Sequence, residues 1–101
     1  MILCIEENNK LTLKDHLDFK HFSIADPYDQ VENSLSFKEL SESCGDDHYW
    51  LNAELIIGLS DGRDDSKWLT NFWDMLRAVE AYGYSDIENK KIKAHLVTDK
   101  K

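Results

Sequence analysis

The sequence predicts an α+β fold in which a small antiparallel sheet carries one main amphipathic helix on one face. Residues 49–59 (YWLNAELIIGL) place apolar side chains at every second position, which is typical of a half-buried strand. Residues 65–82 repeat apolar side chains at about 100° per residue, which predicts an amphipathic helix. Packing the helix on the strand's apolar face would bury both surfaces.

Two weaker patterns predict further strands. ILCIEE and KLTL flank Asn8-Asn9, and asparagine tolerates the positive φ of a tight hairpin turn. Residues 11–24 fit a strand or a helix. Residues 90–97 (KKIKAHLV) alternate and are rich in lysine, which predicts a last strand at the edge of the sheet.

The segment between these elements has two candidate helix starts. Asp26-Pro27 places a capping residue before a proline, so a short helix or a turn is expected to follow. Ser36 and Glu39 have capping-box spacing, and Gly45 is placed to end a helix. A strand remains an alternative because three apolar residues share one parity: Val31, Leu35 and Phe37.

The predicted main helix has clear ends. Asp64, Asp65 and Ser66 are suited to cap its first turn, where negative charge stabilises it by up to about 1 kcal/mol. Residues 60–62 (SDG) predict a turn before the helix, and Gly83 predicts its end. Helix capping therefore accounts for this acidic stretch.

Motifs for catalysis or metal binding are weak. A calcium loop starting at Asp61 would have Arg, Ser and Phe at its third, sixth and twelfth positions, where such loops need other residues. Cys44 and His48 leave a Cys/His-dependent enzyme as an alternative, but no family signature surrounds them. A zinc site at this pair would need two further ligands, and the sequence does not supply them at the usual spacing. We expect no enzyme activity, no catalytic residue, no metal and no cofactor.

Length and charge limit the classes of function. The chain has 101 residues, which predicts a single globular domain over residues 1–101, and its net charge is −8. Residues 26–65 hold eleven acidic residues against Lys38 and Arg63. Such a surface repels phosphate backbones, so no direct binding to nucleic acid is expected. It suits a basic protein partner, because complementary fields speed association.

The sequence predicts a cytoplasmic protein without a membrane segment. No apolar run approaches the ~18 residues of a membrane span. The N-terminal residues MILCIEENNK lack the positive region of a signal peptide. Cys4 and Cys44 are therefore expected to be reduced thiols.

Candidate partner-binding residues are acids and aromatic anchors. Trp50 and Trp73 fall outside the predicted apolar stripes, and tryptophan is enriched in binding hot spots. Arg77 follows Trp73 by one helical turn and is placed to stack on it. Two acidic patches flank residues 49–59: Asp61, Asp64 and Asp65 in one, and Glu42, Asp46 and Asp47 in the other. A single strand would separate them by roughly 30 Å, so one compact interface would use one patch.

In composition, the chain resembles small acidic bacterial immunity proteins and other protein inhibitors. The resemblance covers no aligned residue and transfers no site. It implies a non-enzymatic binding protein that neutralises a basic toxin or nucleic-acid-processing enzyme. The alternative is an accessory or regulatory subunit that self-associates or docks in a larger complex, and the sequence leaves the oligomeric state open.

Overall fold

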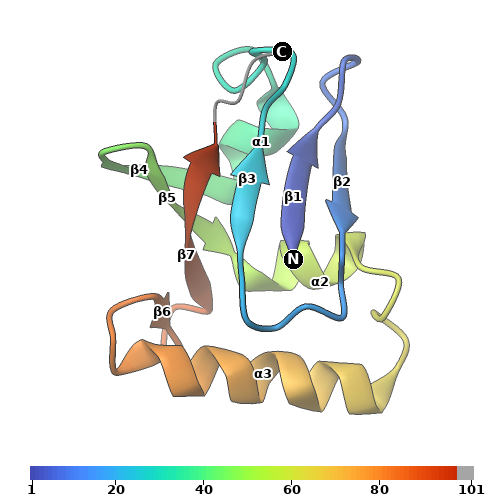
Figure 1. Cartoon of the computed structure of the whole chain (residues 1–101), viewed down its shortest axis with the longest axis vertical. Helices are drawn as coiled ribbons and strands as arrows, with labels where there is room; N and C mark the ends of the chain where they lie inside the picture. Colours follow the sequence, from blue (N-terminus) through green and yellow to red (C-terminus); the bar gives the residue numbers. More distant parts are fainter. Residues whose placement is uncertain (98–101) are drawn as a thin grey trace.

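The computed structural model describes residues 1–97, and all the strands in this part of the chain join one sheet (Figure 1). The sheet order is β2-β1-β3-β7-β5-β4, with β6 also paired to β7. The strands are β1 (Ile2–Ile5), β2 (Leu11–Lys14), β3 (Ser23–Ala25), β4 (Ser41–Gly45), β5 (His48–Asn52), β6 (Ser85–Asp86) and β7 (Lys91–Val97). The helices are α1 (Leu35–Leu40), α2 (Ala53–Leu59) and α3 (Ser66–Glu80).

The α+β class is confirmed, but the prediction of a small antiparallel sheet is wrong. The sheet has seven strands and is mixed, since β3 runs parallel to both β1 and β7. Strand β7 is not at the edge as predicted: it lies between β3 and β5, and the edges are β2 and β4. Pairing of β3 with β7 joins segments far apart in the chain, so no local pattern indicated it.

The N-terminal hairpin is confirmed. Strands β1 and β2 pair antiparallel, and Asn9 adopts the positive φ of 67° expected in the turn. The ambiguous segment 11–24 forms β2, a loop and the start of β3. This loop returns the chain across β1, so that β3 runs parallel to it.

The segment after β3 forms a turn, one of the two alternatives expected at Asp26-Pro27, but the predicted helix start at Ser36 is wrong. The Asp26 carboxylate accepts hydrogen bonds from the backbone N–H groups of Gln30 (2.7 Å) and Val31 (2.9 Å), so it closes a turn. Helix α1 begins instead after Ser34, whose hydroxyl accepts from the Phe37 N–H at 3.2 Å. It ends at Leu40 because β4 follows directly, and Ser36 and Gly45 are not its ends.

The prediction of one strand over residues 49–59 is wrong beyond Asn52. The Asn52 side chain accepts from the backbone N–H groups of Glu54 and Leu55 at 3.0 and 3.2 Å, which caps α2. Ala53 and Ile56 are both buried, whereas Leu55 is 46% exposed. The two buried residues are three positions apart, which suits a helix. The apolar residues of 49–59 therefore follow the strand period of two up to Asn52 and the helical period of about 3.6 after it.

The main helix is confirmed as α3. Asp65 caps it by accepting from the N–H groups of Lys67 and Trp68, at 3.0 and 3.3 Å. Gly83, at φ 82°, follows the helix end. The prediction that this helix covers a sheet face is only partly matched, because α3 runs across the strand ends while α1 and α2 lie behind the sheet (Figure 1).

The two faces of the sheet differ in character. Alternate strand residues such as Leu3, Ile24 and Leu51 are fully buried in the core, together with Phe37 of α1 and Ile56 of α2. The register places the intervening residues on the opposite face, and no helix of residues 1–97 covers its central strands (Figure 1). Within residues 1–97, no helix has the length and apolar character to cross a bilayer.

Candidate functional site

The hairpin of β4 and β5 brings together four predicted partner-binding residues: Glu42, Asp46, Asp47 and Trp50. Asp46 (φ 51°) and Asp47 (φ 59°) occupy the connection, so both adopt left-handed backbone conformations. Two consecutive residues of this kind between paired strands are typical of a type I′ turn, which favours Asn-Gly over two acids. The turn therefore carries two charged side chains at positions where an uncharged pair is more favourable.

Backbone contacts fix this turn, and its carboxylates have no partner among residues 1–97. The carbonyl of Asp46 accepts a hydrogen bond from the His48 ring Nδ1 at 2.8 Å, and the carbonyl of Asp47 accepts from the Leu96 N–H at 2.6 Å. Both aspartates are exposed, and neither carboxylate forms a hydrogen bond or ion pair with another residue in 1–97. The hairpin thus presents two negative charges, unpaired among residues 1–97, on a constrained backbone.

Further negative charge lies behind the turn. Burial raises the pKa of Tyr49, and the charges of Asp47, Glu32 and Asp26 raise it further. Glu32 and Asp26 belong to the segment between β3 and α1, so the fold places them near the hairpin although they precede it in the chain. Because Asp26 is buried and occupied by its turn, Asp47, Asp46 and Glu32 are the exposed acids here.

The open face of the sheet beside the turn carries Trp50. Its ring is partly buried, and the Lys93 ammonium lies 5.8 Å from its centre. Glu42, opposite Trp50 on β4, accepts a hydrogen bond from Lys91 Nζ at 3.2 Å. Glu42 is therefore partly neutralised, whereas the turn acids are not.

Strand pairing also joins two histidines that sequence reasoning did not connect. His48 on β5 is opposite His95 on β7, and their ring centres are 4.8 Å apart. The predicted alternative pair of Cys44 and His48 lacks a comparable contact: the His48 ring nitrogen donates to a carbonyl, and Cys44 is an exposed free thiol. No group of three or more potential metal ligands occurs in the described part of the chain.

The second acidic patch has a different environment. Asp65 is occupied as the cap of α3, and Arg63 donates from its guanidinium to the Ser60 carbonyl at 2.9 Å. Asp61 and Asp64 are exposed but are interleaved with Arg63 and Lys67 in the chain. In Figure 1 this connection (yellow) and the β4–β5 hairpin (green) lie on opposite sides of the molecule. The two patches cannot share one small contact area.

The α3 candidates are also separate from the hairpin. Trp73 is partly buried against the core and contacts Phe72 edge-on, with ring centres 5.7 Å apart. The predicted stacking partner, Arg77, donates instead to Asp74 at 3.0 Å. Both residues thus have intramolecular partners.

Comparison of the chain with protein-family models, with characterised proteins and with solved structures gave no match.

Proposed function

We propose that this protein is a non-enzymatic inhibitor that binds a basic protein partner through its β4–β5 hairpin. The partner class is a toxin or nucleic-acid-processing enzyme, whose phosphate-binding surface is positively charged. Asp46 and Asp47 would contact cationic side chains of the partner, and Trp50 would anchor the interface on the open face of the sheet. The overall charge of −8 would steer the encounter.

The observation that carries this proposal is the unpaired state of Asp46 and Asp47 in a fixed turn. Within residues 1–97, their carboxylates stabilise no helix and pair with no cation. Their left-handed backbone conformation would suit Asn or Gly better, so local stability does not explain two acids at these positions. Ion pairs with a cationic partner would explain why both positions carry a carboxylate.

The first test is affinity capture from native cell extract with two matched charge variants. Asp46→Asn/Asp47→Asn removes the hairpin charges and keeps residues that tolerate a positive φ. Asp61→Asn/Asp64→Asn removes the same charge from the opposite patch and serves as the control. The captured protein is then purified, its affinity is measured at low and high salt, and its activity is assayed with equimolar inhibitor.

The proposal predicts capture of one basic protein, inhibition of its activity, and an affinity that falls with salt. The hairpin variant should bind at least about tenfold more weakly, while the control binds nearly as the wild type does. Equal affinities of the two variants would contradict the assignment of the hairpin. Capture of copies of the same chain alone would instead favour the self-associating regulatory subunit.

A further inference from the structure

A groove of about 500 Å³ lies between the loop before β3, helix α3 and strand β7. The loop before β3 contributes Phe19 and Phe22, α3 contributes Met75 and Val79, and Tyr84 also lines the groove. All five side chains are only partly buried or exposed. Its volume falls in the range of about 300–1,000 Å³ found for small-molecule sites, whose walls are mostly apolar.

The charge around this groove is opposite to that of the protein as a whole. Acidic residues outnumber lysine and arginine by 20 to 12 in the chain. Yet the described lining includes Lys20, His21 and Lys93 and contains no aspartate or glutamate. An apolar cavity with a cationic rim is complementary to a ligand that has an apolar body and a negative head.

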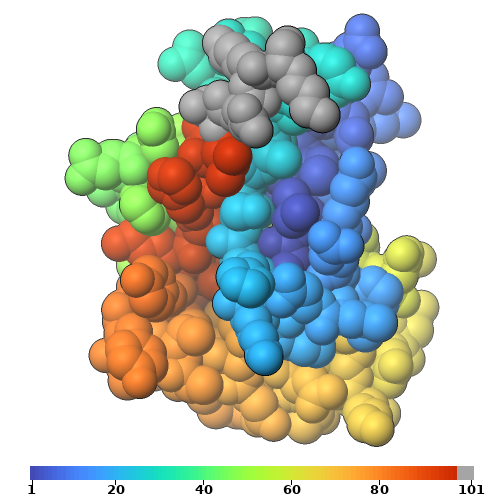
Figure 2. All heavy atoms as spheres, in the orientation of Figure 1, coloured from blue at the N-terminus to red at the C-terminus, as the bar shows by residue number. Residues whose placement is uncertain are grey.

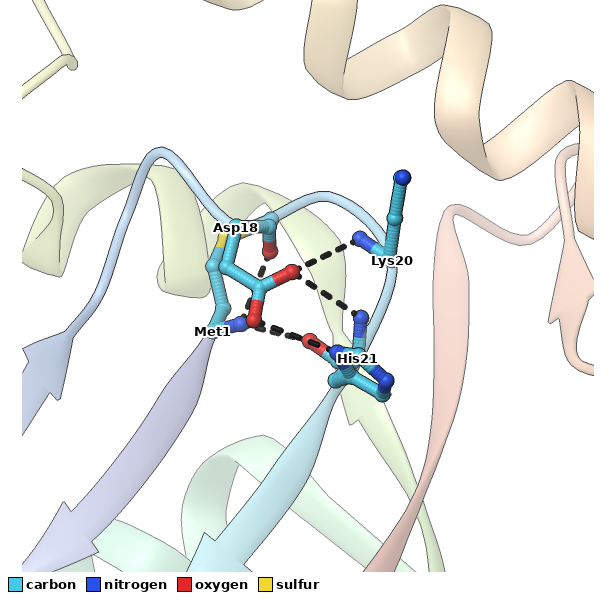
Figure 3. Close-up of polar contacts among 4 residues, drawn as sticks. All are labelled: Met1, Asp18, Lys20 and His21. Carbon is cyan, nitrogen blue, oxygen red and sulfur yellow. Dashed lines mark hydrogen bonds and ion pairs between the residues drawn. The ribbon is translucent and has the colours of Figure 1, made fainter.

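One wall of the groove is held in place by Asp18. Its carboxylate accepts from the backbone N–H groups of Lys20 (3.0 Å) and His21 (3.3 Å), and also contacts the His21 ring (3.3 Å). The Met1 ammonium donates to the carbonyls of Asp18 and His21 (Figure 3). The hydrogen bond from Lys20, followed by the His21 ring contact, holds the pKa of Asp18 below its usual value.

Asp18 is thus engaged with its own loop, while the Lys20 side chain extends away from this carboxylate (Figure 3). The space-filling view shows the blue surface of this loop beside the orange surface of α3 (Figure 2). The groove wall is therefore formed before any ligand binds, which limits the entropy lost on binding.

We propose that this groove binds a small monocarboxylate with an elongated apolar body. The body would lie against Phe19, Met75 and Val79, and the carboxylate would contact Lys20 and Lys93 at the rim. Lys93 lies over the Trp50 ring, a weak contact at a partly exposed site, so a ligand carboxylate can compete for it. This site is separate from Asp46 and Asp47, although Lys93 connects it to Trp50 of the proposed partner interface.

The test uses three probes with the same ten-carbon chain: decanoate, decanol and decyltrimethylammonium, each below its micelle concentration. Backbone amide shifts of the full chain are followed by NMR during titration. Decanoate should bind saturably, with the largest shifts in residues 19–23, 75–79 and 84. The cationic probe should bind at least about tenfold more weakly than decanoate, because its head meets lysines rather than acids.

Two charge variants separate the rim from general electrostatics. Lys20→Glu/Lys93→Glu should weaken decanoate at least about tenfold and leave decanol within about twofold. Lys38→Glu/Lys67→Glu makes the same change in net charge away from the groove, and should leave decanoate binding nearly unchanged. Thermal unfolding checks that each variant is folded.

Three results would overturn the proposal. The first is equal affinity for decanoate and the cationic probe. The second is equal loss of decanoate binding in both lysine variants. The third, which needs no variant, is the largest wild-type shifts falling outside the groove.

Discussion

The β4–β5 turn and the connection between α2 and α3 are both short, acidic and exposed, but their carboxylates have different roles. In the connection, Asp65 accepts two backbone N–H groups and starts α3. In the turn, the carbonyls of Asp46 and Asp47 make the fixing contacts, and their carboxylates are unpaired among residues 1–97. Acid content alone therefore does not distinguish a structural carboxylate from one available to a partner.

The largest expected difference between the two regions is the loss of unfolding free energy when the tryptophan of each is replaced by alanine. Trp68, beside the connection, is 3% exposed and donates from Nε1 to the His16 carbonyl at 2.7 Å. Trp68→Ala should lower the free energy of unfolding by about 3–5 kcal/mol, through lost burial and a cavity. Trp50→Ala, beside the turn, should cost about 1 kcal/mol or less. Urea unfolding measures both, and similar losses would remove the distinction between structural and exposed regions.

A second comparison uses two glycines near the connection. A Cβ atom on Gly62 would lie 2.5 Å from Cγ of Trp68, so Gly62→Ala should destabilise the protein by about 1–3 kcal/mol. A Cβ atom on Gly58, in α2, would meet nothing within 4 Å. Gly58→Ala should therefore stabilise the protein by about 0.5–1 kcal/mol. Thermal melting of both variants tests the close packing of the connection against α3, and a neutral Gly62→Ala would contradict it.

Removing the helix cap at Asp65 should change the free energy of unfolding by less than the substitutions of Trp68 and Gly62. Asp65→Ala leaves the N–H groups of Lys67 and Trp68 without their acceptor, so it should lower the free energy of unfolding by about 1 kcal/mol. Asp61→Ala, in the same connection, should change it by no more than about 0.5 kcal/mol. Chemical denaturation distinguishes the two. Equal losses would show that general charge, rather than the cap, stabilises this region.

The parts of the fold that local chemistry determines were predictable from sequence. The cap at Asp65, the turn at Asn9 and the apolar stripe of α3 all depend on residues within a few positions of each other. The sheet topology was not predictable, because β7 enters between β3 and β5 through contacts distant in the chain. The strand prediction for residues 53–59 is wrong because their apolar spacing fits both periods, and the Asn52 cap is the local signal of the helix start.

The candidate site was predictable in part. Composition identified both acidic patches, but only the three-dimensional arrangement distinguishes Asp65, which caps a helix, from Asp46 and Asp47, which are unpaired among residues 1–97. Likewise, the contact of His48 with His95 depends on the pairing of β5 with β7, which no spacing in the sequence indicates. The groove was missed because its lysines and apolar residues come from a loop, a helix and a strand.

The most direct measurement combines stability and binding in Asp46→Asn/Asp47→Gly, which installs the Asn-Gly pair that a type I′ turn favours. If the acids serve a partner rather than the fold, the free energy of unfolding should rise by about 1 kcal/mol, because glycine adopts a positive φ without strain. Affinity for the basic partner should fall at least about tenfold. A variant that is less stable than the wild type, or that binds the partner equally well, would contradict the account.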